Sequence, residues 1–316
     1  MSHIIYIGAP EADATAFASL ARSDFPNIDL FATNARNEAL AKSADAQAII
    51  GHHFQFDDAL VRGAPQLRWI QSLTSGTDAI LRLPSLAPDV VITSTRGMHG
   101  PQMSELVFLQ MLALARNLRR TLDNQRERRW QRWPQPLLLG KTLVIVGVGS
   151  VAEVLALRAQ AFGMQVLGVS SSARRPPAFE RIFNRHDLRE AASQADFLVL
   201  TVPLSSETEN LVNEGILSAM KPGAFLINVA RGGVLDERAL LHCLRGGRIA
   251  GAALDVFRQV PLPPDDPLWA EERLIITPVL GGMSDVYLEQ AYPLVKQNIR
   301  HFLAGRMDQM LNIVPR

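Results

Sequence analysis

The first hundred residues alternate short apolar runs with segments in which apolar residues recur every three or four positions. The apolar runs have the length of strands and occupy residues 3–8, 28–33, 46–53, 67–73 and 90–95. Helical periodicity separates them, as over 11–23 and 37–44. Strands that are apolar on both faces are typical of a parallel sheet covered by helices. The pattern therefore predicts an α/β domain built from a βα repeat.

A long helical segment follows at 100–120. Pro101 falls in its first turn, where a missing N–H costs nothing, and the segment is apolar nearly all round, as a helix buried between two domains is. The next stretch, 119–133, is rich in arginine and carries Trp130 and Trp133. We interpret it as a solvated helix end running into a connector, with the tryptophans packed against a neighbouring domain or subunit. No fold signature supports a nucleic-acid surface.

A second βα series begins at 141–170, where an apolar strand, a glycine turn, a helix and a second apolar strand follow one another. This order is the context that a dinucleotide-binding fingerprint requires. Gly147 permits the tight turn, Gly149 lets backbone amides approach a pyrophosphate at the helix N-terminus, and Ala152 replaces the third glycine, which governs only helix–strand packing. The predicted cofactor-binding residues of this turn are Gly147, Val148, Gly149, Ser150 and Val151.

The end of the second strand of this series indicates which cofactor binds. An NAD site usually has Asp or Glu about 20 residues after the glycines, whereas an NADP site prefers small polar groups and arginine around the 2′-phosphate. The chain has Ser170 and Ser171 followed by Arg174 and Arg175. Arginine pairs with phosphate through charge-assisted hydrogen bonds. We therefore predict NADP(H) as the preferred cofactor, with NAD(H) possible.

Composition narrows the class of protein. The 316 residues are 47% hydrophobic, which suits two domains of about 100–200 residues each. The net charge of +1 offers no field that would attract nucleic acid or a membrane. No apolar run reaches the roughly 20 residues that span a bilayer. Cys243 is the only cysteine and cannot form a disulfide within the chain, which predicts a cytoplasmic protein. The histidines lack metal-ligand spacing, so no metal site is predicted.

Residues 195–257 resemble the cofactor domain of the D-isomer-specific 2-hydroxyacid dehydrogenases, a family that includes glyoxylate/hydroxypyruvate reductases. The matching positions there include Pro203, Thr208, Asn228, Arg231, Gly232 and Asp255. In the first domain, "SLTSGTDAI" (72–80) is similar to the family's carboxylate-cradling loop, and "GMHGPQMSE" (97–105) to the entry to its interdomain helix. The resemblance covers nearly the whole chain.

This resemblance implies two Rossmann-like or flavodoxin-like domains with parallel sheets and a cleft between them. The substrate domain would comprise 1–98 and 287–316, and the cofactor domain 99–286. A homodimer formed through the cofactor domain, a small carboxylate substrate and an active site in the cleft are also implied. The implied substrate-binding residues are Thr74, Ser75, Gly76 and Arg231. Further implied cofactor contacts are Val202, Pro203, Thr208, Val229, Ala230, Arg231 and Asp255.

Two of the family's three catalytic positions differ in this chain. The arginine that binds the carboxylate and polarises the carbonyl is present as Arg231. The glutamate and the histidine that it orients are replaced by Val260 and Val279. Joint loss is physically reasonable, because a buried glutamate without its histidine would be an unpaired charge.

Three hypotheses follow from this replacement. Another group donates the proton, the candidates being His52, His53, His99, Tyr287 and water. Alternatively, the substrate needs no protein acid, as with an imine that already carries its proton, and an apolar pocket favours a bulkier substrate. Finally, the chain binds a nucleotide without turnover, as a regulatory protein would. Retention of Arg231 favours an oxidoreductase, because a nucleotide sensor has no use for a carboxylate site.

Overall fold

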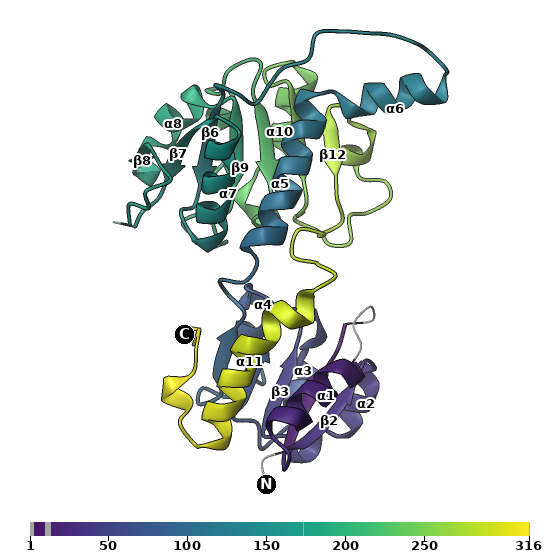
Figure 1. Cartoon of the computed structure of the whole chain (residues 1–316), viewed down its shortest axis with the longest axis vertical. Coiled ribbons are helices and arrows are strands. Elements are labelled where there is room, and N and C mark those ends of the chain that lie inside the picture. Colours follow the sequence, from purple (N-terminus) through teal and green to yellow (C-terminus); the bar gives the residue numbers. More distant parts are fainter. Residues whose placement is uncertain (1–2, 10–13, 173, 316) are drawn as a thin grey trace. The chain divides into compact units, whose positions relative to one another are not determined.

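The computed structural model describes residues 3–9, 14–172 and 174–315. The chain forms two compact units, one made of Met1–Met98 with Ser284–Arg316 and the other of His99–Met283. We call them unit 1 and unit 2. Each contains one parallel β-sheet with helices packed against it (Figure 1). The predicted fold class, two α/β domains with parallel sheets, is confirmed.

Unit 1 has a five-stranded sheet. Its strands are β1 (His3–Ile7), β2 (Asp29–Thr33), β3 (Ala48–Gly51), β4 (Trp69–Ser72) and β5 (Val91–Ser94). Their order across the sheet is β2-β1-β3-β4-β5, which is the flavodoxin-like order. Each of the five predicted apolar runs contains one of these strands. Strands β3 and β4 are buried along their whole length, and β4 includes the polar residues Gln71 and Ser72.

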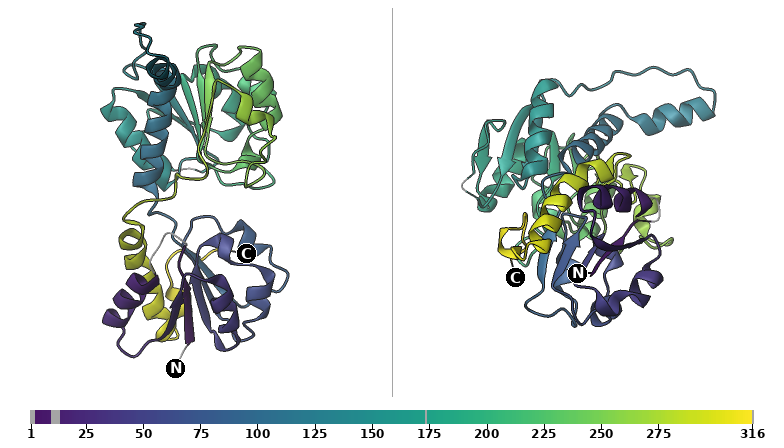
Figure 2. Two further views of the ribbon diagram at one scale, coloured as in Figure 1. Left: turned by 90° about the vertical axis from the view of Figure 1, so that its right-hand side faces the viewer. Right: turned by 60° about the horizontal axis from the view of Figure 1, so that its bottom comes forward.

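Helices cover both faces of the unit 1 sheet (Figure 2, left). They are α1 (Ala14–Asp24), α2 (Arg36–Ala41), α3 (Asp58–Arg62), α4 (Asp78–Leu81) and α11 (Tyr287–Leu303). On one face, Phe17 of α1 and Tyr292 of α11 join a common hydrophobic core, and on the other face Leu60 of α3 and Ile80 of α4 join a second. Residues 11–13 of the helix expected at 11–23 lie outside the described residues.

Unit 2 has a seven-stranded sheet. Its strands are β6 (Thr142–Val146), β7 (Gln165–Val169), β8 (Arg181–Phe183), β9 (Phe197–Leu200), β10 (Phe225–Asn228), β11 (Gly251–Leu254) and β12 (Leu274–Ile276). They run in the order β12-β11-β10-β9-β6-β7-β8. The chain proceeds outward from β6 through β7 to β8, then returns to place β9 on the other side of β6. This reversal is the topological switch point at which open α/β sheets bind ligands.

Unit 2 also contains six helices among its described residues. They are α5 (Gly100–Ala115), α6 (Leu118–Arg126), α7 (Ser150–Ala161), α8 (Leu188–Gln194), α9 (Glu214–Leu217) and α10 (Glu237–Arg245). Helices α5 and α7 share one hydrophobic core with the sheet, and α8 and α10 pack on the opposite face. Cys243 of α10 is fully buried there, as its place in an apolar helical repeat predicts.

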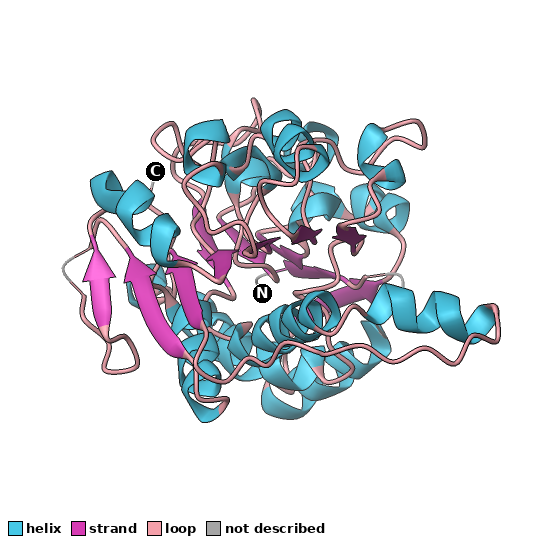
Figure 3. Ribbon diagram, turned by 90° about the horizontal axis from the view of Figure 1, so that it is seen from above, coloured by secondary structure: helices cyan, strands magenta, loops and turns pink. Residues whose placement is uncertain are grey.

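The segment from 100 to 120 is not one helix, as its periodicity suggested. Asn117 has a left-handed backbone with φ of 50°, and its side chain accepts a hydrogen bond from the Arg120 N–H at 3.3 Å, which caps α6. Figure 3 shows α6 and the loop after it extending from the rest of unit 2. Trp130 in this loop is 96% exposed in the single chain, so its packing against a neighbouring domain or subunit stays a prediction. Trp133 instead lies under Arg120, whose guanidinium carbon is 4.4 Å from the centroid of the Trp133 ring.

Among the described residues, none of the helices combines the length and apolar character that crossing a bilayer requires.

Candidate active site

The carboxyl ends of the central unit 2 strands form one continuous edge. Val146 of β6 pairs in register with Val169 of β7 and with Leu200 of β9. Leu200 pairs with Asn228 of β10, which in turn pairs with Leu254 of β11. The next residues along the chain are Gly147, Ser170, Thr201, Val229 and Asp255. Segments that are far apart in sequence, and that contain most of the predicted cofactor residues, therefore begin side by side.

The glycine turn after β6 has the geometry of a phosphate cradle. Gly147 has φ of 102°, and a Cβ there would lie 2.8 Å from the Val202 amide nitrogen, so only glycine fits. A Cβ on Gly149, by contrast, would meet no atom within 4 Å. The twelve-residue helix α7 begins at Ser150, and the N–H groups of a first helical turn have no partner within the helix. Open space before such a turn fits a pyrophosphate.

The remaining positions of this turn have packing roles. Ala152 is fully buried in the core shared by α7 and the sheet, where a side chain larger than a methyl group would separate helix from strand. Val148 is also buried in that core, whereas Val151 is half-buried. With these side chains wholly or partly buried, cofactor binding by Val148, Ser150 and Val151 stays a prediction that rests on their backbone groups.

Serine and arginine side chains cluster at the end of β7, where the sequence predicted the ribose site. The Ser170 N–H donates to the Phe183 carbonyl at 3.0 Å, which ties this loop to β8. Arg174 forms an ion pair with Glu153 at 2.7 Å. Arg175 donates to the carbonyl oxygen of Arg174 at 2.9 Å. Both arginines are exposed, and the ion pair holds Arg174 near the N-terminal part of α7.

Arg185 is a further member of this cluster that the sequence analysis missed. Its Nη2 donates to the Ser171 hydroxyl at 3.0 Å, and its Nη1 lies 2.6 Å from a Glu207 carboxylate oxygen. The side chain is only 22% exposed. The available signal was that Arg185 follows β8 by two residues, but β8 has only three residues and was not recognised.

The loop after β9 is organised by Thr208. This side chain is buried, its hydroxyl donates to the Pro203 carbonyl at 2.7 Å, and it accepts from the Ser205 N–H at 2.7 Å. Val202 is buried next to the Gly147 turn, on the other side of the switch point. Thr208 therefore fixes the course of the loop, which brings Pro203 to the edge of the proposed cofactor site.

The turn after β10 presents Arg231. The Asn228 side chain accepts from the Ala230 N–H at 3.0 Å and donates to the Arg231 carbonyl at 3.1 Å, so one amide closes the turn. A Cβ on Gly232 would lie 1.9 Å from the Phe257 carbonyl carbon, so glycine is required where these segments cross. Arg231 is half-buried, and its Nη1 donates to the Ala230 carbonyl at 2.7 Å.

Asp255 organises the neighbouring loop that carries Val279. Its carboxylate accepts hydrogen bonds from the Thr277 hydroxyl at 2.6 Å, the Leu280 N–H at 2.8 Å and the Gly281 N–H at 2.9 Å. Burial raises the pKa of the Asp255 carboxyl, and the three hydrogen bonds act in the opposite direction. Asp255 is thus a structural support of this loop, whatever contact it makes with a cofactor.

Val279 has a left-handed backbone, with φ of 58°. This conformation is unusual for a β-branched residue, whereas asparagine, aspartate and histidine adopt it several times more readily than other side chains. Its side chain is 43% exposed, and that of Val260 is 62% exposed. Neither valine is therefore part of a closed apolar core.

His99, one of the candidate proton donors, is the residue before α5 in unit 2 and is 7% exposed. Desolvation by burial lowers the pKa of His99 to about 4. A neutral imidazole at physiological pH has no readily available extra proton to donate. Burial therefore argues against His99 as the general acid.

In unit 1, the predicted carboxylate loop follows β4 directly. The Thr74 hydroxyl donates to the Gly76 carbonyl at 3.0 Å and lies 3.1 Å from His53 Nδ1. Ser75 is exposed and Gly76 is half-buried. His53 is thus the candidate acid that contacts this loop through its ring.

His52 and Tyr287 lie close to the same loop. Their ring centroids are 5.4 Å apart, and the Tyr287 hydroxyl donates to the Leu73 carbonyl. Burial raises the pKa of Tyr287. A phenol that already donates within the protein is a poor proton donor to a substrate. Within the part of the chain that the structure describes, no three His, Cys, Asp or Glu side chains are placed to hold a metal ion.

Comparison with known proteins identifies the family. Residues 108–281, more than half of the chain, match the model of the D-isomer specific 2-hydroxyacid dehydrogenase, NAD binding domain. A glyoxylate reductase of Korarchaeum cryptofilum is 32% identical over 261 residues, which cover 81% of this chain and 79% of that protein. The chain belongs to the D-isomer-specific 2-hydroxyacid dehydrogenase family. The resemblance noted from its motifs is confirmed.

Solved structures of the family agree over nearly the full length. A family protein from Aeromonas salmonicida superposes with a TM-score of 0.91, at 32% identity and 99% coverage of both chains. An NADPH-dependent glyoxylate/hydroxypyruvate reductase from Sinorhizobium meliloti, solved with NADP and sulfate, gives a TM-score of 0.84 at 25% identity, covering 99% of this chain and 98% of that one. As a dehydrogenase of this family, the chain is an oxidoreductase with a nicotinamide-binding domain, and the open cradle at Gly149 fits that cofactor.

Proposed function

We propose that this dehydrogenase transfers a hydride between NADP(H) and a small 2-oxo or 2-hydroxy acid. The observation that carries the proposal is the turn holding Arg231, at the same sheet edge as the nucleotide cradle of Gly147 and Gly149. A guanidinium is permanently charged and forks to match a carboxylate. Glyoxylate and hydroxypyruvate, the substrates named for relatives, are acids of this class.

In this proposal the residues of both units have distinct roles. Residues 1–98 and 287–316 form the substrate domain, in which Thr74, Ser75 and Gly76 cradle the carboxylate, and residues 99–286 hold the cofactor. Arg231 binds the carboxylate and polarises the adjacent carbonyl. The bound nicotinamide supplies the hydride. Fixing the substrate in this way converts an encounter into an oriented reaction, which is a large part of catalysis.

The proton donor is the altered part of the mechanism. We place Val260 and Val279 at the positions of the family's glutamate and histidine, and the backbone at Val279 supports this, because its φ of 58° suits histidine better than valine. His53, which contacts Thr74, or water then protonates the carbonyl oxygen. Loss of a positioned acid costs about 10²–10⁴ in rate, so we expect slow turnover.

Absorbance measurements with purified protein test the proposed activity. NADPH is mixed with a panel of 2-oxo acids that includes glyoxylate, hydroxypyruvate and arylpyruvates, and we expect NADPH oxidation with at least one. Binding of NADPH with no oxidation across the panel would contradict turnover of these substrates and support the alternative of a nucleotide-binding regulatory protein.

A double variant tests the altered proton transfer. Val260→Glu with Val279→His is expected to raise kcat by about 10²-fold or more, because it restores an oriented acid. Val260→Gln with Val279→Asn is the matched control, since asparagine also tolerates the left-handed backbone but cannot donate a proton in the same way. Equal kcat values for both variants would show that no family-like relay is recovered at these positions.

The preference for NADP(H) rests on Ser170, Ser171, Arg174, Arg175 and the newly found Arg185. Arg185→Gln is expected to raise the Kd for NADPH about tenfold and to leave the Kd for NADH unchanged, because only NADPH carries the 2′-phosphate. Arg189→Gln, an exposed arginine of α8, is the control. Equal losses for both cofactors in Arg185→Gln would contradict a phosphate-specific role.

The assembly and the compartment are also part of the proposal. A homodimer through the cofactor domain is supported by exposed apolar side chains in unit 2. A single buried cysteine, Cys243, fits the cytoplasm, where disulfides are rare.

A further inference from the structure

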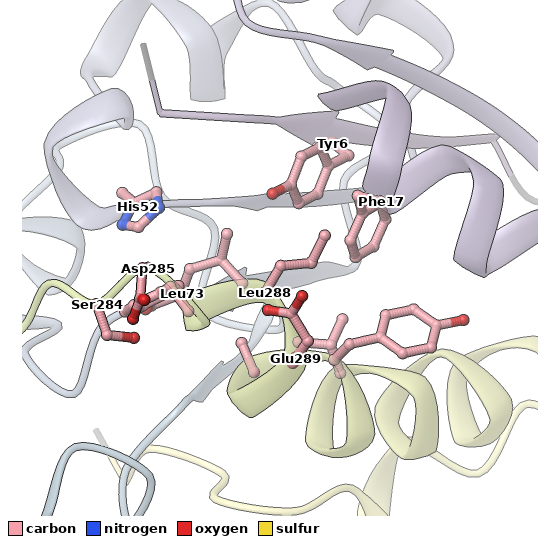
Figure 4. Close-up of a pocket in the computed structure, with 12 residues that line it drawn as sticks. Tyr6, Phe17, His52, Leu73, Ser284, Asp285, Leu288 and Glu289 are labelled. Atoms are coloured by element: carbon pink, nitrogen blue, oxygen red, sulfur yellow. The ribbon is translucent and has the colours of Figure 1, made fainter. Parts of the chain in front are cut away.

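Unit 1 contains a cavity of about 360 Å³ to which no role has been given so far (Figure 4). It lies between β1, α1 and the first turns of α11. Its lining residues are Tyr6, Phe17, His52, Leu73, Ser284, Asp285, Tyr287, Leu288, Glu289, Ala291, Tyr292 and Val295. A volume of this size is at the lower end of small-molecule sites, which range over about 300–1,000 Å³.

Tyr6 is the feature that most directly indicates a ligand. It is 3% exposed, yet in the described part of the chain its hydroxyl has no hydrogen-bond partner. The ring stacks on Phe17 at 3.8 Å between centroids, and in Figure 4 its oxygen points into the cavity, toward His52. Burial raises the pKa of Tyr6 to about 12, so the hydroxyl stays neutral. The oxygen is not among the fully enclosed unpaired polar atoms, so it lies at the surface of the cavity, where it is available to a polar atom of a ligand.

Two carboxylates give the cavity its charge. Asp285 and Glu289 both line it, and the Glu289 carboxylate faces the same space in Figure 4. Neither has an ion-pair partner among the described residues, whereas Asp24 on nearby α1 binds Lys296 at 2.5 Å and the Tyr292 hydroxyl at 2.7 Å. Among the described residues that line it there is no lysine or arginine. The field in the cavity therefore disfavours anions.

Aromatic rings complete the lining. Tyr6, Phe17, His52, Tyr287 and Tyr292 all contribute to it, and Phe17 packs edge-on to Tyr292 with centroids 5.8 Å apart. Aromatic faces attract cations through their quadrupoles and also accept apolar carbon. Carboxylates, ring faces and one phenolic oxygen together match an ammonium group on a short hydrocarbon chain.

We propose that this cavity binds the ammonium group of a small organic amine. Glu289 and Asp285 balance its charge, the Tyr6 hydroxyl oxygen accepts one N–H, and the rings contact the adjoining carbon atoms. The volume limits the ligand to a compact amine rather than a long polyamine or a peptide.

The cavity adjoins the predicted carboxylate loop. Leu73 lines the cavity, its carbonyl accepts the Tyr287 hydroxyl, and Thr74 follows it directly. The ammonium group therefore has two possible sources, a free amine that acts as an effector or the far end of an amine-bearing 2-oxo acid. Only the second source rests on the proposed function.

Calorimetric titration of the full chain with n-butylammonium tests the proposal, with n-butanol and butyrate as neutral and anionic counterparts. We expect saturable binding of the ammonium ion and at least tenfold weaker binding of both counterparts. Asp285→Asn with Glu289→Gln is expected to weaken binding at least tenfold, and Tyr6→Phe about fivefold. No saturable binding to the wild-type protein, or unchanged binding in both variants, would overturn the proposal.

Two control variants separate the site from general effects on folding. Tyr292→Phe removes a lining hydroxyl that is already bonded to Asp24, and Asp308→Asn removes an exposed carboxylate elsewhere in unit 1. Both are expected to bind n-butylammonium as the wild type does, and thermal unfolding confirms that each variant is folded. Equal weakening in Tyr292→Phe and Tyr6→Phe would overturn the role of the unpaired hydroxyl.

Kinetics then distinguish the two sources. If the amine belongs to the substrate, the Asp285/Glu289 variant raises KM for an amine-bearing 2-oxo acid but not for pyruvate. If it is an effector, n-butylammonium changes the rate of reduction of a simple 2-oxo acid, and the variant abolishes this response. Reductase activity without amine binding would contradict the proposed amine site but not the proposed function. Amine binding without reductase activity would contradict the proposed function but not the amine site.

Discussion

Desolvation of an imidazole disfavours its protonated form, and so determines whether it can act as an acid. His99 was a reasonable candidate because it precedes the predicted helix at 100–120. The structure shows it 7% exposed, with a pKa lowered to about 4. Arg231 and the Thr74 loop, by contrast, were chosen because their neighbours in sequence form specific motifs, and their roles stay predictions.

The lowered pKa of His99 predicts a pH dependence of stability. Between about pH 6.5 and 4 the unfolded chain binds a proton at this residue that the folded chain does not, so stability is full above pH 6.5 and falls as the pH falls toward 4. The expected loss is about 3 kcal/mol, since one pKa unit corresponds to about 1.4 kcal/mol.

Urea unfolding of the wild type and of His99→Gln over pH 4–7 measures this loss. The variant should have a flatter profile across that window, because glutamine does not titrate. Carboxylates with lowered pKa, such as Asp24 and Asp196, contribute equally to both proteins and cancel in the difference. Parallel profiles would show that His99 is not the residue responsible.

Elements with a strong local pattern were predictable, and short or irregular ones were not. The first strand, the helix and the second strand predicted at 141–170 appear as β6, α7 and β7, because each has both the length and the apolar pattern of its type. Strand β8 has three residues, so its pattern is too short to recognise, and Arg185 was missed with it. Asn117 interrupts a run that is otherwise helical. Its left-handed backbone is a property of a single residue, so hydrophobic periodicity does not reveal it.

Two glycines of the turn before α7 have separable roles. Gly149→Ala is expected to leave the thermal midpoint near that of the wild type, because its Cβ would meet nothing within 4 Å, but to raise the Kd for NADPH about tenfold or more, because the methyl group occupies the path of the pyrophosphate. Gly147→Ala is expected to lower stability by about 1–3 kcal/mol as well, because it combines a φ of 102° with a clash against Val202.

Gly223→Ala is the control for this pair, since its Cβ would also lie in open space but away from the cradle, in the turn before β10. It should change neither the midpoint nor NADPH binding. Unchanged NADPH affinity in Gly149→Ala would mean that the cofactor does not approach this turn.

In the molecule as a whole, the order of the strands in each sheet follows the general rules for connecting parallel strands. Parallel βα repeats allow few topologies, so the fold class was predictable from the alternation of apolar runs. The homodimer was expected only from the resemblance and stays a proposal, because periodicity does not show which apolar residues stay exposed. In unit 2 the exposed large apolar side chains between residues 109 and 162 are Leu109, Leu118, Leu122, Trp130, Leu137, Leu139, Leu157 and Phe162.

Large exposed apolar patches mark interaction surfaces, and a second copy of the chain is the partner that we propose. Light scattering should therefore give twice the chain mass of 34.8 kDa. Trp130→Glu with Leu137→Glu is expected to shift the protein to the monomer without unfolding it, because Trp130 is 96% exposed and packs on little else. Leu303→Glu, an exposed leucine of unit 1, is the control and should remain dimeric. A monomeric wild type, or a variant that stays dimeric, would show that this apolar surface serves another purpose.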